Sequence, residues 1–147
     1  MAVSATREVV IEATVDEIRA VITAAESLPE WSDIHLTSEV LERDDRGRPV
    51  RTKMKVKIVG ITDEQVLDYT WHDDGLSWTL RSAKQQRAQD ARYTFTPEGD
   101  NTRVRFELTI DPLLPLPGFL LRRATRGVMR TATQGLRKRV LSQKKPR

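Results

Sequence analysis

Residues 50–71 read VRTKMKVKIVGITDEQVLDYTW and contain the clearest alternating pattern in the chain. Up to Ile58, apolar or neutral side chains alternate with basic ones, and after Gly60 a second alternating run ends at Trp71. Alternation over this length is typical of strands that bury one face and expose the other. The stretch therefore predicts a pair of strands joined by a short turn.

A two-residue turn at residues 59–60 gives this hairpin a definite register. In that register Lys55 lies opposite Glu64, and Arg51 lies opposite Asp68, on the face that points away from the core. Facing charges of opposite sign support the antiparallel pairing. We therefore interpret the row of lysines as a solvated sheet face rather than a nucleic-acid patch.

Five further segments show the same period of two, so seven strands are expected in all. They are residues 3–13, 36–43, 76–82, 91–96 and 104–110. From residue 36 onward, short polar turns separate the runs, and this spacing predicts a meander of neighbouring antiparallel strands.

Two helical regions complete the predicted layout. Thr14 and Glu17 match a capping box, in which each side chain accepts a backbone N–H at the start of a short helix. Residues 28–31 (LPEW) predict a bend or a single helical turn that directs Trp31 into the core. A long helix follows Gly118. The order is one strand, a helical insert, six strands and one long helix, which is an α+β architecture.

The composition fits one globular domain. The chain has 147 residues, of which 38% are hydrophobic and 31% charged. We place the domain at residues 1–143 and a basic, flexible tail at residues 144–147. The absence of cysteine excludes disulfides and thiolate chemistry. We recognise no signal peptide and no apolar run of the ~20 residues that span a membrane, so a cytoplasmic protein is expected.

Basic residues are concentrated at the C-terminal end of the chain. Residues 113–147 hold ten of the 25 basic residues and no acidic residue. On a helical wheel most of these arginines fall on one side, while small residues such as Ala124, Ala132 and Gly135 fall on the other. A helix that only filled a core would carry Leu and Ile there. The small side indicates close contact with the sheet or empty volume beneath the helix, and we favour a roof over a cavity.

Three segments resemble a known superfamily, and with the order of elements the resemblance spans essentially the whole chain. They are residues 9–17 (VVIEATVDE), 28–32 (LPEWS) and 112–118 (PLLPLPG). The chain resembles the SRPBCC or START-like superfamily, and it looks most like small actinobacterial members of the polyketide cyclase/dehydrase, coenzyme-Q-binding-like branch. The resemblance implies the helix-grip fold, a curved seven-stranded antiparallel sheet wrapped around a long C-terminal helix, with a short helical insert between strands 1 and 2.

The resemblance also implies an apolar ligand cavity between the sheet and the last helix, entered beside the N-terminus of that helix. The apolar and aromatic positions that match cavity-facing ones are Met54, Leu67, Tyr69, Trp71, Trp78, Tyr93, Leu121, Val128 and Ala132. Gln65 and Ser82 are expected to supply polar contacts that orient a ligand. Simple core packing is the alternative for each of these residues.

Few other side chains suggest chemistry. His35 is expected at a surface or capping position and His72 in a solvated hairpin turn, and Asp63 is expected to be solvated near a hairpin end. These residues make no recognisable metal-binding spacing, so neither a metal nor a cofactor is expected. The catalytic residues of any reaction stay unknown.

Three functions fit the sequence. We favour binding of a small hydrophobic ligand, such as a lipid, a polyketide or a quinone. The alternative is a polyketide cyclase, aromatase or dehydrase that uses the polar cavity residues Gln65, Tyr69, Ser82 and Tyr93. The third is docking of the basic C-terminal helix to an anionic membrane, by weak contact, or to nucleic acid. Nucleic acid is a less suitable partner, because base stacking needs aromatic residues and this region has only Phe119.

Overall fold

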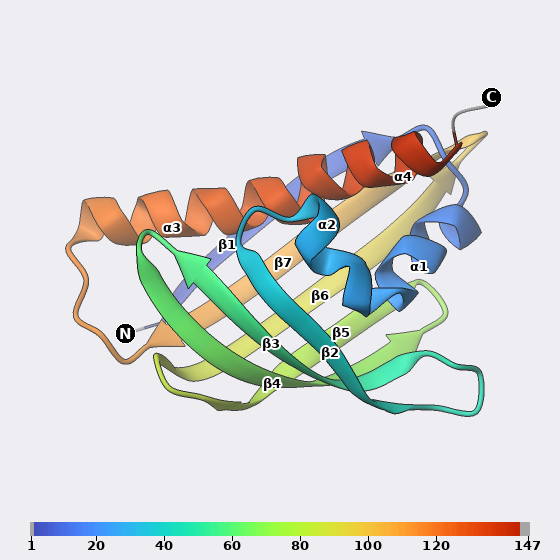
Figure 1. Cartoon of the computed structure of the whole chain (residues 1–147). Coiled ribbons are helices and arrows are strands. Elements are labelled where there is room, and N and C mark those ends of the chain that lie inside the picture. The colour runs from blue at the N-terminus through green and yellow to red at the C-terminus, as the bar shows by residue number, and fades with distance from the viewer. Residues whose placement is uncertain (1, 145–147) are drawn as a thin grey trace.

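Seven antiparallel strands form one sheet in the order β1-β7-β6-β5-β4-β3-β2, and the sheet curves around a long C-terminal helix (Figure 1). The structure is a computed structural model and describes residues 2–144. The strands are β1 (Val3–Ile11), β2 (His35–Arg43), β3 (Pro49–Ile58), β4 (Ile61–His72), β5 (Gly75–Ala83), β6 (Gln86–Glu98) and β7 (Asn101–Pro112). The predicted meander is confirmed from β2 to β7, and β1 closes the other edge by pairing with β7.

A helical insert follows β1 and consists of α1 (Val15–Thr23), the 3₁₀ turn η1 (Ala25–Ser27) and α2 (Leu28–Trp31). The predicted capping box is present at α1. The Glu17 N–H donates to Thr14 Oγ1 at 3.1 Å, and the Thr14 N–H donates to Glu17 Oε1 at 2.8 Å. Both bonds satisfy N–H groups that a helix start leaves without an internal partner.

The C-terminal helix is continuous but not uniform. It runs as α3 (Gly118–Arg130), a π-helical segment η2 (Thr131–Gly135) and α4 (Leu136–Lys144). Lys144, which the sequence assigned to the flexible tail, is the last residue of α4, and its Nζ donates to the Glu12 carbonyl at 2.9 Å. The rest of the predicted tail, residues 145–147, lies outside the described residues.

The predicted register of the β3–β4 hairpin is confirmed. Lys55 pairs with Glu64, and Arg51 pairs with Asp68, whose Oδ1 accepts from Arg51 Nε at 2.8 Å. The two-residue turn has positive φ at both positions, 44° at Val59 and 83° at Gly60.

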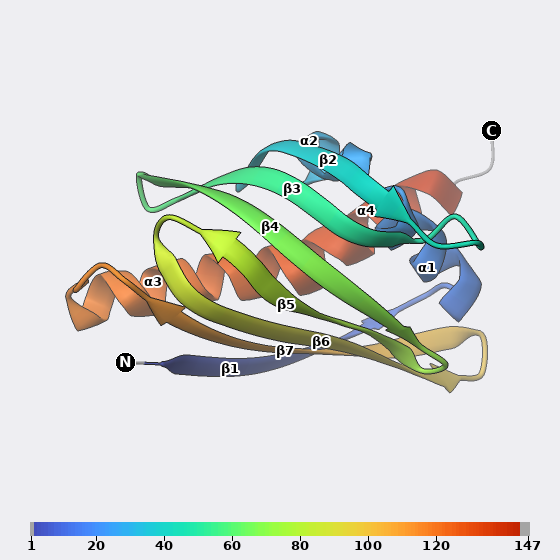
Figure 2. The same ribbon diagram turned by 90° about the horizontal axis from the view of Figure 1, so that it is seen from below.

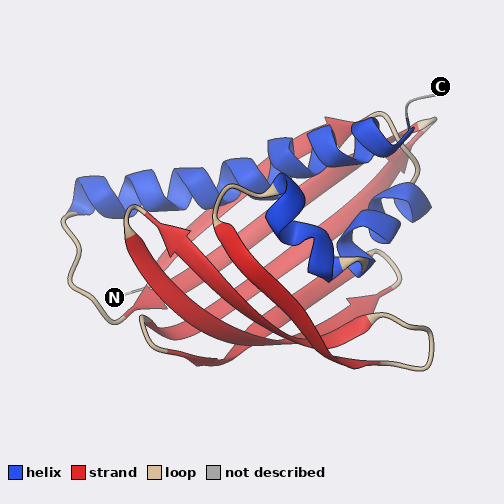
Figure 3. Ribbon diagram, in the orientation of Figure 1, coloured by secondary structure: helices blue, strands red, loops and turns tan. Residues whose placement is uncertain are grey.

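All helices lie on the concave side of the sheet, and Figures 2 and 3 show no helix or strand of residues 2–144 over the other face. On that outer face Lys53, Lys55 and Lys57 are exposed, which confirms the solvated interpretation of the lysine row. On the concave side the core forms around Phe106 and Tyr93 of the sheet and Leu136 and Val140 of α4. The arrangement is the helix-grip α+β fold expected from the sequence.

Candidate functional site

A cavity of about 120 Å³ lies between the concave face of the sheet, the helical insert and the C-terminal helix. Apolar and aromatic side chains form most of its wall, because the inward rows of β3 to β7 are apolar and the helix brings small residues. Nine of the eleven residues predicted from the sequence line it, namely Met54, Gln65, Leu67, Tyr69, Trp71, Trp78, Tyr93, Val128 and Ala132. The empty volume beneath the helix is therefore present, and the binding role of these nine residues stays a prediction.

A second hollow of about 90 Å³ adjoins the cavity, and we call it the vestibule. Val128 and Gln86 are among the lining residues that the two spaces share. The vestibule is also bordered by Val59 at the tip of the β3–β4 hairpin and by Leu114 in the loop before α3. Leu121, the tenth predicted residue, lines the vestibule rather than the cavity.

The prediction that Ser82 faces the cavity is wrong. The β4–β5 ladder shifts by one residue, because Leu67 pairs with Leu80 whereas Val66 pairs with Ser82. The extra residue, Arg81, is a bulge that interrupts strict alternation, so Ser82 is exposed and lines neither space.

Gln65 is a polar side chain of the cavity wall without a hydrogen-bond partner, and the Trp31 indole N–H is a second such group within residues 2–144. Gln65 is only 5% exposed and lines the cavity, and within residues 2–144 no hydrogen bond engages its amide. A buried amide without a partner is costly, since desolvation is not compensated. Its donor and acceptor are therefore available to a ligand.

Tyr69 offers a second polar group from the same strand. Its hydroxyl accepts a hydrogen bond from Thr52 Oγ1 at 3.2 Å, which leaves its own O–H free to donate. Burial raises the pKa of Tyr69 to about 12, so the hydroxyl stays protonated at neutral pH. In contrast, the Tyr93 hydroxyl is already used, because it donates to the Ala132 carbonyl at 2.7 Å. Burial also raises the Tyr93 pKa.

The sequence analysis did not predict that His35 lines the cavity. It expected His35 at a surface or capping position, and that expectation is wrong. It is the first residue of β2, pairs with the inward-facing Val56 and lines the cavity. Its Nδ1 lies 2.6 Å from Ser32 Oγ, which also accepts the Ile34 N–H. Burial lowers the His35 pKa to about 4, although the nearby Asp33 partly opposes this shift, so the ring is neutral at pH 7. Only the β2–β3 register could have revealed this position.

The comparisons with known proteins agree with this architecture. The family described as "Polyketide cyclase / dehydrase and lipid transport" matches residues 2–141. The chain belongs to this family. No curated protein sequence matches it.

Among solved structures, a START superfamily protein from Mycobacterium smegmatis is 20% identical and has a TM-score of 0.85, over 95% of this chain and 98% of that one. A protein from Thermus thermophilus is also 20% identical, with a TM-score of 0.80 over 97% and 100% of the two chains. The Zhui aromatase/cyclase from Streptomyces sp. R1128 is 9% identical, with a TM-score of 0.81 over 99% and 97%. At these identities the likeness establishes the shared fold.

In this family member Asp63 is buried, contrary to the solvated position expected for it. Its Oδ1 accepts the backbone N–H groups of Lys84 at 2.9 Å and Gln85 at 3.1 Å, so the carboxylate holds the β5–β6 turn beside the vestibule. No local pattern in the sequence indicated this contact, because its partners are backbone atoms of a distant turn.

The other polar groups of the cavity wall are paired with one another. Gln86 Nε2 reaches Asp63 Oδ2 at 3.4 Å, and Gln89 Nε2 donates to Gln86 Oε1 at 2.9 Å. The Trp78 indole donates to Gln89 Oε1 at 2.9 Å. This chain of bonds satisfies Trp78, Gln86 and Gln89. Among the described residues, the groups left for a ligand are the Gln65 amide, the Tyr69 hydroxyl, the second ring nitrogen of His35 and the Trp31 indole N–H.

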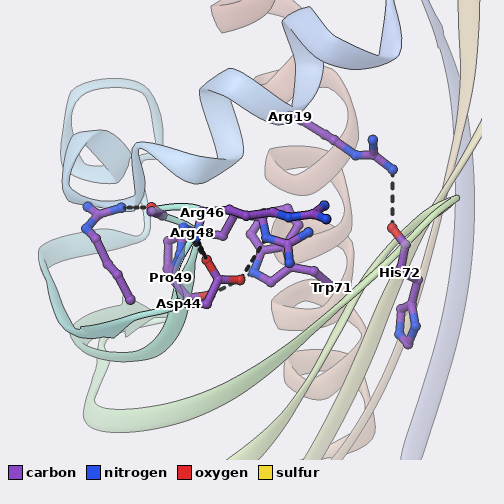
Figure 4. Close-up of polar contacts among 9 residues, drawn as sticks. Arg19, Asp44, Arg46, Arg48, Pro49, Trp71 and His72 are labelled. Atoms are coloured by element: carbon purple, nitrogen blue, oxygen red, sulfur yellow. Dashed lines mark hydrogen bonds and ion pairs between the residues drawn. The ribbon is translucent and has the colours of Figure 1, made fainter.

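The end of the cavity bordered by Trp71 and Pro49 is fixed by polar contacts outside it (Figure 4). The Trp71 indole donates to the Pro49 carbonyl at 2.8 Å, and the Arg48 guanidinium lies 5.6 Å from the centre of the Trp71 ring. His72 does not line the cavity. Its ring bonds to Ser77, and its carbonyl accepts from Arg19.

Proposed function

We propose that the protein binds a compact apolar molecule that carries an oxygen-containing polar group, with its rings in the cavity and its oxygen at Gln65. The observation that carries this proposal is the buried, unpaired Gln65 amide in a mainly apolar space. A ligand hydroxyl or carbonyl would satisfy that amide, and the Tyr69 hydroxyl supplies a further donor. Membership of the family and the START and aromatase/cyclase neighbours support a hydrophobic ligand.

The size of the space favours ring compounds over long acyl chains. An apolar cavity of about 150 Å³ accepts a benzene molecule. The cavity of about 120 Å³ and the adjoining vestibule of about 90 Å³ together suit one or two fused rings. We therefore favour a polyketide-like or quinone-like ligand over a long-chain lipid.

Calorimetric titration with 2-naphthol and with naphthalene tests the proposal, because the two probes differ by one hydroxyl. The wild-type protein is expected to bind 2-naphthol about tenfold more tightly, since that hydroxyl pairs with Gln65. Gln65→Leu should remove this preference while naphthalene affinity is kept. Gln134→Leu, at an exposed position of the π-helical segment, is the matched control.

Two further results would decide against the proposal. Failure of the wild type to bind either probe would contradict binding in the cavity. Equal affinities for the two probes, unchanged in Gln65→Leu, would contradict the role of the amide. Val128→Trp, which fills space that cavity and vestibule share, should abolish binding of both probes.

Proton transfer, as in a cyclase or dehydrase, is the second candidate function, and the Ser32–His35 pair favours it. With Nδ1 donating to Ser32, the other ring nitrogen carries a lone pair and could accept a proton from carbon beside a ligand carbonyl. A pKa of about 4 makes the imidazole a weak base at pH 7, so we rank turnover below binding. Exchange of the α-protons of 2-tetralone with deuterated water tests it. Wild-type catalysis that His35→Phe loses would favour the enzyme.

A further inference from the structure

The basic residues of the C-terminal helix divide into two groups. In α4 three of the four basic residues are paired with acidic residues of the body of the protein, whereas Lys138 is exposed and has no carboxylate at ion-pair distance within residues 2–144. Arg137 pairs with Glu12 at 3.0 Å, Arg139 with Glu30 at 2.9 Å, and Lys144 with Glu17 at 3.6 Å. Each of these three cations already has an acidic partner within the protein.

The arginines of α3 differ from those of α4. All four are exposed, and within residues 2–144 none has a carboxylate at ion-pair distance. They are Arg122, Arg123, Arg126 and Arg130. Residues 113–147 contain no acidic residue, so no helical neighbour can neutralise these arginines, and among the described residues they also lack body partners of the kind that Glu12 and Glu30 provide for α4. An unneutralised positive charge therefore lies along α3.

Exposed apolar side chains gather at the same end of the molecule. Six large apolar residues are exposed in the described part of the chain. Two of them, Val59 and Leu114, line the vestibule, and two more, Leu113 and Phe119, lie close to Leu114 in the chain, in the loop before α3 and in its first turn. Phe119, in the first turn of α3, is 63% exposed. Figures 1 and 2 both place the β3–β4 hairpin tip, the β7–α3 loop and the start of α3 at one end. We call these four residues, with Arg122, Arg123 and Arg126, the mouth surface.

Val59, at the tip of the β3–β4 hairpin, is not the residue type that this turn favours. A two-residue hairpin turn with two positive φ angles favours Asn-Gly, and a β-branched residue at φ 44° is strained. The strained residue puts an apolar side chain into solvent at the border of the vestibule. The turn requires a positive φ at residue 59 but does not require a valine there, and a strained residue that the turn does not need is a reason to look for a function.

We propose that the mouth surface docks on an anionic lipid bilayer. Arginines without carboxylate partners fit lipid phosphates, and the apolar residues beside them fit the outer part of the acyl region. Docking in this orientation would open the vestibule toward the bilayer, so an apolar ligand could move between bilayer and cavity without crossing water. Nucleic acid would use the charges but not the aliphatic side chains. Docking is measured on the ligand-free protein and is independent of the ligand proposed above.

Sedimentation with large vesicles tests the proposal, with phosphatidylcholine alone compared with phosphatidylcholine and phosphatidylglycerol. The wild type is expected to bind only the mixed vesicles, less strongly as salt increases. The triple variant Arg122→Gln, Arg123→Gln, Arg126→Gln should bind about 100-fold more weakly, since each basic residue near such a surface contributes a factor of about five. A control triple variant, Lys53→Gln, Lys55→Gln, Lys138→Gln, removes the same charge elsewhere and should bind like the wild type.

A second pair of variants tests the apolar part of the surface. Phe119→Ser should weaken vesicle binding about tenfold. Leu41→Ser, at an exposed position of the edge strand β2, should not. Either of two results would overturn the proposal: no binding to mixed vesicles, or equal losses in the two triple variants. Binding to double-stranded DNA that the arginine variant loses and Phe119→Ser keeps, together with vesicle binding insensitive to Phe119→Ser, would assign the surface to nucleic acid instead.

Discussion

The two halves of the C-terminal helix contact the protein in different ways. In α4, Leu136 and Val140 are fully buried in the core. In α3 only Met129 is buried, and the residues above the vestibule include Ala124 and Thr125. The paired cations lie on α4, whereas the arginines of α3 have no acidic partner within residues 2–144. One helix therefore packs into the core with its C-terminal half and leaves empty space beneath its N-terminal half.

The largest expected effect is a difference in unfolding free energy between a variant of α4 and a variant of α3. Leu136→Ala should lower the free energy of unfolding by about 3 kcal/mol, because it opens a void in a closed part of the core. Val128→Ala should cost about 1 kcal/mol, because Val128 already borders empty space. Urea unfolding measures both. Similar losses for the two variants would show that α3 packs as tightly as α4.

Tyr93 joins the sheet to the helix at the junction of the two halves. Tyr93→Phe keeps the ring but leaves the Ala132 carbonyl without its donor, so unfolding should become easier by about 1.5 kcal/mol. The measurement is again urea unfolding, combined with titration of 2-naphthol. Unchanged stability with lost affinity would show that the hydroxyl serves the ligand rather than the helix.

At Val59 stability and docking should change in opposite directions. Val59→Asn should stabilise the fold by about 1 kcal/mol, because Asn accepts a positive φ at lower cost. The same change should weaken binding to anionic vesicles. Thermal unfolding and vesicle sedimentation check the two parts, and a variant that gains stability without losing vesicle affinity would remove Val59 from the mouth surface.

The smallest expected effect is a pH dependence that distinguishes α4 from α3. The hydrogen bond from Arg137 lowers the pKa of Glu12 below its usual 4.5. The pair therefore stabilises the fold fully above about pH 4.5, and this contribution is lost as pH falls through the lowered pKa. Unfolding of Glu12→Gln across this range should converge with the wild type in acid. Arg122→Gln, on α3, should show no such convergence.

The sequence predicted those features that depend on local pattern. The rows of β3 and β4, the register set by the turn at 59–60 and the capping box of Thr14 all follow from residues close together in the chain. The small residues of the last helix indicated the cavity correctly, because small side chains do not fill the space between the helix and the sheet.

The features that the sequence missed depend on contacts between distant residues. A single bulge moved Ser82 to the outer face, and the β2–β3 register placed His35 at the cavity. Asp63 is buried because backbone groups of another turn bind it. The pairing of Arg137 and Arg139 in α4 depends on Glu12 and Glu30, which are more than 100 positions away in the sequence.

The placement of the tryptophans has a spectroscopic consequence. The chain has three, Trp31, Trp71 and Trp78, and all of them line the cavity. No other tryptophan contributes a background signal, so the intrinsic fluorescence of the unlabelled protein comes entirely from the cavity wall. An entering ligand would change the polarity around these indoles, and the emission spectrum would report its arrival and departure in real time.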